Sequence, residues 1–182
     1  VAGAPPITIQ NLMETQYLLT EGLKKDAGYI RSIDVNIGDV SYRDIPTRLN
    51  SWLDELNRIL VVVDRGELRG DDLYIEVAKL HYDFVKIHPF TDGNGRMARI
   101  VANIPLARAN EGLFYVPVED KAIYINFLKT LDLLDPSSSE YAREIDLMAS
   151  QFKKWSRYSS FAEIASDVVT PLVKEDIDSL GV

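Results

Sequence analysis

Residues 88–99 read HPFTDGNGRMAR, and this stretch decides how the chain on either side of it is arranged. Ahead of it, apolar residues recur at a helical spacing over residues 72–87, and Pro89 stops that helix at or just before His88. Behind it, residues 96–109 again have a helical pattern. The sequence therefore predicts a short loop between two helices, which opens onto the N-terminus of the second helix.

The start of that second helix is suited to an anion. The first amides of a helix have no partners inside the helix, and the helix dipole places partial positive charge there. Gly93 and Gly95 let an anion come close to these amides, and Asn94 between them tolerates the left-handed region. Arg96 and Arg99 lie three residues apart, so both guanidinium groups can face the same anion. One phosphate group can thus be held by amides and the next by arginine.

An acid and a histidine complete the chemistry of the loop. Asp92 would repel a phosphate unless a cation lay between them, and Mg²⁺ held by one carboxylate and by phosphate oxygens resolves this conflict. His88 can take a proton at neutral pH. Taken singly, a Gly-Asn-Gly string is usually a turn, a helical arginine is usually solvated and a histidine is usually structural. Their convergence in one loop predicts attack by a hydroxyl group on a magnesium-bound polyphosphate.

The loop resembles the signature of the Fic (filamentation induced by cAMP) family: HPF, any residue, Asp or Glu, GNGR, two residues and Arg. Every fixed position is matched. A weaker resemblance covers about residues 7–132, including a GYIR segment at residues 28–31, the helix with LHYDFVKI and a later helix with a tyrosine. The resemblance implies a mainly α fold: a Fic-type helical bundle with a small β-hairpin, the flap, near the active site.

The resemblance also implies an activity, in which AMP passes from ATP to a Ser, Thr or Tyr hydroxyl of a target protein and pyrophosphate leaves. By matching positions, His88 would be the general base, Asp92 would hold Mg²⁺ and Phe90 would anchor the loop. The phosphates would be bound by Gly93, Asn94 and Gly95 around the α- and β-phosphates, by Arg96 at the β-phosphate and by Arg99 at the γ-phosphate. The related Doc branch, which transfers phosphate, has a lysine and no second glycine where this sequence has Gly95 and Arg96, and this difference favours AMP transfer.

Two residues outside the loop bear on the nucleotide, and a third, His81, is interpreted as structural. Tyr124 matches a family position that lines the adenine pocket, and a core tyrosine is the alternative interpretation. A nearby family asparagine is replaced here by Asp132, so the contacts to the base are expected to differ. His81 is interpreted as structural, because nothing near it supplies the spacing of metal ligands.

Residues 32–42 change the hydrophobic period. Apolar and polar residues alternate from Ser32, and Gly38-Asp39 supplies a turn, so a hairpin is predicted. An exposed hairpin edge can pair with an extended segment of another protein, although a purely decorative hairpin is an alternative. Because the matching element of the Fic family positions the target, the resemblance implies that a target protein docks by strand addition to residues 32–42.

Caps and apolar spacing predict the remaining elements. Further helices are expected over residues 10–23 with Thr8 as N-cap, 46–63, 120–134 and 140–158 with a serine N-cap, and a last helix before an acidic end in 159–182. Pro105 is expected to kink the helix after the motif or to split it near Ile104.

Composition bounds the class of protein. A chain of 182 residues that is 46% hydrophobic and 26% charged predicts a single domain over residues 1–182, with a Fic core at about 7–134 and a C-terminal helical extension at about 137–182. The net charge of -8 argues against nucleic acid as a partner. The sequence has 0 cysteines, no membrane-spanning run and no signal peptide, so a cytoplasmic protein without a membrane partner is expected.

Regulation is where the sequence departs from the family. Many Fic proteins carry an inhibitory helix with Ser or Thr, three residues, then Glu-Gly or Glu-Asn, whose glutamate pairs with the second motif arginine. No complete copy is present: Tyr17 stands at the hydroxyl position before Glu21-Gly22, and Glu163 is followed by Ile164. Because the sequence begins at Val1 rather than Met, it is expected to be a fragment or to lack its own inhibitor. The inhibitor would then lie in a missing segment or in a separate protein, or there would be none, and no self-inhibition is expected.

Other functions stay open from the sequence. The same site could transfer another nucleotide or a phosphate group, or could remove AMP from a modified protein. A non-catalytic module that binds nucleotide or protein is the remaining alternative, and the presence of both His88 and Asp92 argues against it.

Overall fold

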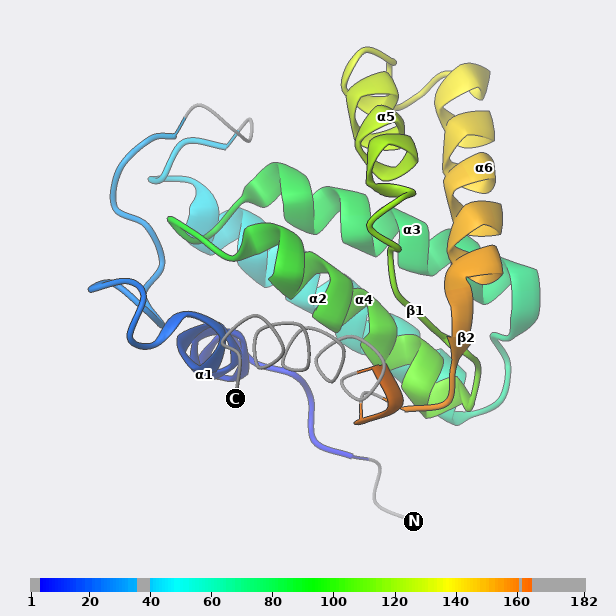
Figure 1. The fold of residues 1–182 in the computed structure, drawn as a ribbon, viewed down its shortest axis with the longest axis horizontal. Helices are drawn as coiled ribbons and strands as arrows, with labels where there is room; N and C mark the ends of the chain where they lie inside the picture. Colours follow the sequence, from blue (N-terminus) through cyan, green and yellow to red (C-terminus); the bar gives the residue numbers. More distant parts are fainter. Residues whose placement is uncertain (1–3, 36–39, 161, 165–182) are drawn as a thin grey trace, which may run out of the picture.

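The computed structural model describes residues 4–35, 40–160 and 162–164, and it confirms a mainly helical fold with a small antiparallel sheet (Figure 1). The elements are α1 (Ile9–Thr20), α2 (Ile45–Asp64), α3 (Gly70–Ile87), α4 (Asn94–Ala109), β1 (Leu113–Phe114), α5 (Lys121–Asp132), α6 (Ser139–Trp155) and β2 (Ser156–Tyr158). In the described part of the chain, no helix is long and apolar enough to cross a bilayer.

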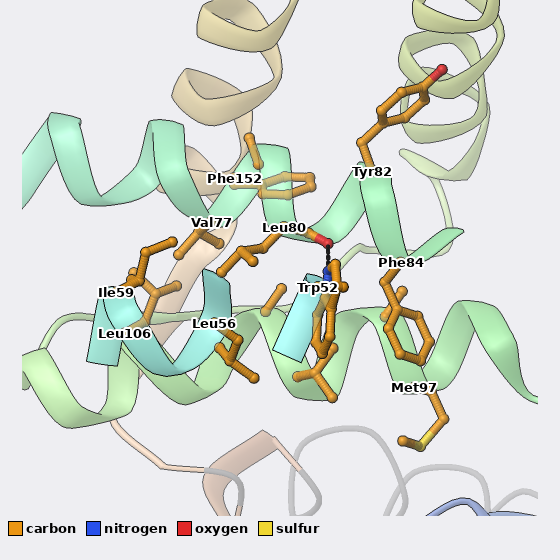
Figure 2. Packing of buried hydrophobic residues seen from close by; sticks show 14 of the residues in the cluster. Trp52, Leu56, Ile59, Val77, Leu80, Tyr82, Phe84, Met97, Leu106 and Phe152 are labelled. Atoms are coloured by element: carbon orange, nitrogen blue, oxygen red, sulfur yellow. Dashed lines mark hydrogen bonds between the residues drawn. The ribbon is translucent and has the colours of Figure 1, made fainter. Parts of the chain in front are cut away.

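Helix α3 is the centre of the fold, because it packs against α2, α4 and α6 (Figure 1). The apolar residues that recur at helical spacing in α2 and α3, as predicted, supply much of the core. Trp52 of α2 packs edge to face on Phe84 of α3, with 5.0 Å between ring centroids, and its indole Nε1 donates to the Leu80 carbonyl at 2.9 Å (Figure 2). This contact satisfies the indole while the ring is buried.

The predicted N-cap at Thr8 and the predicted serine N-cap of the later helix are confirmed, and the serine is Ser138. The Asn11 amide donates to Thr8 Oγ1 at 3.3 Å, while the Thr8 amide donates to Asn11 Oδ1 at 3.0 Å, so the two residues form a capping box. Ser138 accepts from the Tyr141 amide at 3.1 Å and begins α6. These local rules place both helix starts without tertiary information.

Of the two outcomes predicted at Pro105, a kink or a split of the helix, the split is wrong, because α4 continues through this residue to Ala109. A proline inside a helix removes one hydrogen bond from the ladder. Pro105 and its neighbour Leu106 are buried in α4. Tertiary packing of the helix offsets the missing bond, since most helical stability in a folded domain comes from packing.

The hairpin predicted over residues 32–42 is also corrected. The described residues 32–35 and 40–42 contain no strand, and residues 36–39 lie outside the described residues. The sheet is formed instead by β1 and β2, with Leu113 opposite Tyr158. A lone two-stranded hairpin is marginal in water, whereas β1 and β2 pack on helices of the core.

Candidate functional site

The HPFTDGNGRMAR loop joins α3 to α4, as predicted, and its backbone is unusual at both ends. His88 is the C-cap of α3 with φ 48°, and Gly93 is the N-cap of α4 with φ 80°. A left-handed backbone is uncommon for a residue with a side chain and costs about 1 kcal/mol. The surrounding contacts must therefore hold His88 in this conformation.

Inside the loop, Phe90 and Asn94 tie the turn together. Phe90 is fully buried. Its amide donates to Asn94 Oδ1 at 3.0 Å, and Asn94 Nδ2 donates to the Phe90 carbonyl at 2.7 Å. The side chain of Asn94 is thus used within the loop, and its backbone amide is what the residue can offer to an anion.

The first amides of α4 are available for a ligand. The first intrahelical bond runs from the Met97 amide to the Gly93 carbonyl at 2.9 Å. The amides of Asn94, Gly95 and Arg96 precede that bond, where a helix has no internal partners for its donors. A Cβ on Gly93 would lie 3.2 Å from Thr20 Cγ2, so the loop approaches α1 closely at this point.

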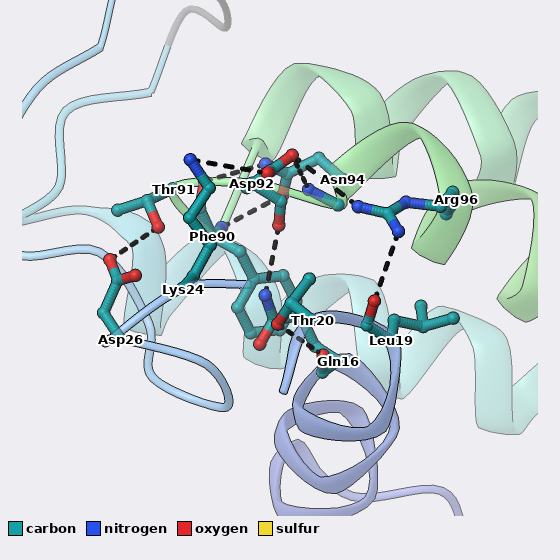
Figure 3. Close-up of polar contacts among 11 residues, drawn as sticks. Gln16, Leu19, Thr20, Lys24, Asp26, Phe90, Thr91, Asp92, Asn94 and Arg96 are labelled. Carbon is teal, nitrogen blue, oxygen red and sulfur yellow. Dashed lines mark hydrogen bonds and ion pairs between the residues drawn. The ribbon is translucent and has the colours of Figure 1, made fainter. Parts of the chain in front are cut away.

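Asp92 lies between two cationic groups. Its Oδ2 is 3.7 Å from Lys24 Nζ and its Oδ1 is 3.8 Å from Arg96 Nη2, while Oδ1 also accepts from the Gly93 amide at 2.6 Å (Figure 3). Arg96 in turn donates to the carbonyl of Leu19 at the end of α1 at 3.2 Å. Among the described residues, no group of three or more His, Cys, Asp or Glu side chains is placed to hold a metal.

Helix α1 is attached to the loop by residues that the sequence did not reveal. Gln16 is buried, and its Nε2 donates to the Asp92 carbonyl at 3.1 Å (Figure 3). Its Oε1 accepts from the Gly28 amide. Thr91 donates to Asp26 at 2.6 Å. The bonds from Gln16 to Asp92 and from Thr91 to Asp26 join residues more than sixty positions apart, so no spacing in the sequence indicates them.

His88 has the hydrogen-bonding state of a base. Its Nδ1 lies 3.4 Å from the Val85 carbonyl. A carbonyl can only accept, so Nδ1 carries the proton in that contact and Nε2 is left as an acceptor. Burial lowers the pKa of His88; the Val85 carbonyl opposes this shift and the charge of Arg31 adds to it. The neutral imidazole is therefore favoured at pH 7.

A pocket of about 380 Å³ lies beside the loop. Its lining combines residues of the motif with an apolar wall from the segment before α5 and from α5 itself. The lining residues are Val85, His88, Asn94, Gly95, Arg99, Tyr115, Val116, Pro117, Val118, Lys121, Tyr124, Ile125 and Leu128. A second pocket of about 200 Å³ shares Arg99 and Tyr115 with the first and adds Arg96. A volume of this size accommodates a small ligand.

Tyr124 lines this pocket and is also buried. Its hydroxyl is 3.0 Å from His81 Nε2, and the guanidinium of Arg99 lies 5.8 Å from its ring centroid. Burial lowers the pKa of His81 to about 4, so the imidazole is neutral. Asp132 does not line the pocket; it accepts from Tyr82 at 2.8 Å and from Lys86 at 2.7 Å.

The structure thus brings five of the eight predicted site residues to one pocket: His88, Asn94, Gly95, Arg99 and Tyr124. Arg96 lines the adjoining pocket. Asp92 and Gly93 lie in the same loop without lining either pocket.

The fold is similar to that of Fic-domain proteins. The sequence profile described as Fic/DOC family matches residues 6–106, and the chain belongs to that family. The chain is similar to a Fic domain containing signaling protein from Bacteroides thetaiotaomicron, with a TM-score of 0.65 and 27% identity over 82% of this chain and 59% of that one. It is also similar to Fic-1 (residues 134–508) from Caenorhabditis elegans, with a TM-score of 0.63 and 26% identity over 82% of this chain and 43% of that one.

Two curated relatives carry the name protein adenylyltransferase. The Caenorhabditis elegans protein adenylyltransferase fic-1 is 33% identical over 133 residues, which is 71% of this chain and 25% of that protein. The Nematostella vectensis protein adenylyltransferase Fic is 35% identical over 124 residues, which is 67% of this chain and 28% of that protein. The chain thus spans about a quarter of the length of these relatives.

Proposed function

We propose that this chain is the catalytic part of a protein adenylyltransferase, which transfers AMP from ATP to a Ser, Thr or Tyr hydroxyl of a target protein. The observation that carries the proposal is that His88, Gly95 and Arg99 line one pocket. A base, helix-start amides and an arginine are the groups that hydroxyl attack on a polyphosphate needs. The names of the curated relatives support AMP as the transferred group.

In this proposal the triphosphate lies along the start of α4. The backbone amides of Asn94 and Gly95 at the helix start would face the α- and β-phosphates. The Gly93 amide, which donates to Asp92 Oδ1 in the structure, would join them by exchanging that acceptor for a phosphate oxygen. Arg96 would contact the β-phosphate and Arg99 the γ-phosphate. Tyr124 and the apolar wall of the pocket would hold the adenine ring of ATP, because flat rings stack on flat apolar surfaces.

Asp92 is the residue that would hold Mg²⁺. Its carboxylate is about half exposed and directly precedes the helix-start amides of α4. One carboxylate with phosphate oxygens and waters is the usual protein environment of Mg²⁺ on a nucleotide. The ion would neutralise charge on the phosphates when it is bound.

His88 would perform the proton transfer. Its unprotonated Nε2 takes the proton of the target hydroxyl while the hydroxyl oxygen bonds to the α-phosphorus. The bond from that phosphorus to the oxygen bridging to the β-phosphate breaks, and pyrophosphate leaves with the electron pair. The lowered pKa of His88 keeps the base available at neutral pH.

The target would dock on the segment of residues 32–42 by strand addition. Ile33 is 60% exposed although it is apolar, which leaves side-chain surface for a partner. We also propose that inhibition comes from another protein or from a segment beyond this sequence.

Mass spectrometry tests the proposal. The wild-type chain and His88→Ala are incubated with MgATP and cell lysate, and peptides are searched for AMP on Ser, Thr and Tyr. Modified peptides with the wild type and none with His88→Ala are expected, with ATP binding retained in the variant. Equal modification by both proteins would contradict the role of His88. Loss of AMP from a pre-modified protein would instead favour AMP removal, and the absence of both reactions would favour a binding module.

A further inference from the structure

Arg31 is a buried cation that no part of the proposed chemistry uses. It is 3% exposed. Its Nε donates to the His88 carbonyl at 2.7 Å, Nη1 donates to the Ile33 carbonyl at 2.8 Å, and Nη2 donates to the Val40 carbonyl. Its backbone amide donates to the Pro89 carbonyl at 2.9 Å. One residue therefore bonds two successive carbonyls of the loop and both ends of the segment of residues 32–42.

Burying the charge of Arg31 costs free energy unless other groups compensate it. The nearest carboxylate is that of Asp34, 3.8 Å away and 65% exposed, which gives only partial compensation. Burial lowers the pKa of Arg31, and Asp34 opposes that shift. Carbonyl oxygens take the place of a buried counter-ion. Only the planar fork of arginine offers enough donors to reach carbonyls on two separate segments at once.

Two of the bonded carbonyls belong to His88, whose backbone is left-handed, and to Pro89 after it. His88 has φ 48°, and its peptide bond to Pro89 is flanked by the two carbonyls that Arg31 holds. The direction of the His88 imidazole depends on this backbone conformation. A left-handed backbone is unfavourable for histidine, so other contacts must hold it. Holding both carbonyls restrains the loop at His88 and Pro89.

We propose that Arg31 is a positioning residue that couples the target-docking segment of residues 32–42 to the orientation of His88. The catalytic part of this inference rests on the proposed function, whereas the coupling itself does not. A target that straightens or clamps the segment moves the Ile33 and Val40 carbonyls, and through Arg31 it acts on the His88 carbonyl. ATP binding is not affected, because no contact of Arg31 reaches Asp92, Arg96 or Arg99.

Hydrogen exchange measures the coupling without any need for activity. Two amides report on the two ends: Tyr42, which donates to Asp34 Oδ1 at 2.8 Å, and Phe90, which donates to Asn94 Oδ1 at 3.0 Å. Arg31→Lys keeps the charge and loses the fork, so exchange is expected to rise about tenfold at both amides. Asp34→Ala removes the acceptor of the Tyr42 amide and leaves Arg31 unchanged. If the segment and the loop are coupled, exchange is expected to rise at Phe90 as well as at Tyr42.

The matched control is Arg58→Lys, because Arg58 is exposed on α2 and pairs only with Glu55 among the described residues. Both reporter amides should exchange as in the wild type in this variant. If Asp34→Ala changes Tyr42 alone, the coupling is wrong. If Arg31→Lys raises exchange throughout α3 and α6, the residue is only a structural cation and the inference also fails.

Kinetics then separates positioning from binding. In Arg31→Lys we expect kcat for AMP transfer to fall about 100-fold, as for a misplaced base, with KM for ATP within about twofold of the wild type. A proportional loss in ATP affinity would overturn the inference. If the wild type transfers no AMP while exchange responds as described, the coupling stands and the proposed function fails.

Discussion

The buried histidine His81 makes the stability of this protein depend on pH in a calculable way. Its side chain is fully buried on α3, and its ring lies against Phe152 at 5.2 Å and against Tyr124 at 5.6 Å between centroids. Burial lowers its pKa from the ordinary 6.5 to about 4. The unfolded chain therefore binds a proton at this residue more readily than the folded protein does.

The sign and size of the effect follow from this difference. Stability is complete above pH 6.5 and is lost as the pH falls from 6.5 toward 4, because protonation then favours the unfolded chain. Between pH 7 and pH 5 the loss at His81 alone is about 2 kcal/mol. Below about pH 4 both states are protonated and His81 causes no further loss.

Urea unfolding of the wild type and His81→Gln at pH 7 and pH 5 measures this term. Glutamine can still bond the Tyr124 hydroxyl but does not titrate, and all other groups are common to both proteins. The wild type should lose about 2 kcal/mol more than the variant between the two pH values. Equal losses in the two proteins would refute a neutral buried imidazole at His81.

Three further outcomes are expected. Because burial lowers the pKa of His88, initial rates of AMP transfer should stay level around pH 7 and fall only as the pH drops below 6.5; a fall that begins above pH 7 would contradict this. Asp92→Asn should weaken ATP binding with Mg²⁺ but not without it in calorimetry, and an equal loss in both cases would exclude Asp92 as the metal ligand. Gly112→Ala should reduce the unfolding free energy by about 1–3 kcal/mol, because its Cβ would lie 2.8 Å from the Ser156 carbonyl oxygen; an unchanged thermal midpoint would disprove the close approach.

The sequence was sufficient wherever the information was local. The motif loop is contiguous, so its residues arrive at the same place once α3 ends at Ile87 and α4 begins at Asn94. Helix starts at Thr8 and Ser138 depend on side chains within three residues of the cap. Apolar spacing in α2 and α3 identified the faces that meet in the core.

What the sequence missed depends on contacts between distant segments. The alternation in residues 32–42 predicted strands, but the described ends of the segment are held by Arg31 and Asp34 side chains instead. The pairing of Leu113 with Tyr158 joins residues across α5 and α6 and has no local signal. Arg31 itself lay within the GYIR resemblance, yet its five bonded carbonyls are visible only in the folded chain.

The most direct test of the central claim uses ATP labelled on either the α- or the γ-phosphate. Wild type and His88→Ala are incubated with Mg²⁺, each labelled nucleotide and cell lysate, and protein-bound label is measured. AMP transfer predicts label from the α-phosphate only, and none with His88→Ala. Label from the γ-phosphate would show phosphate transfer and would contradict the account.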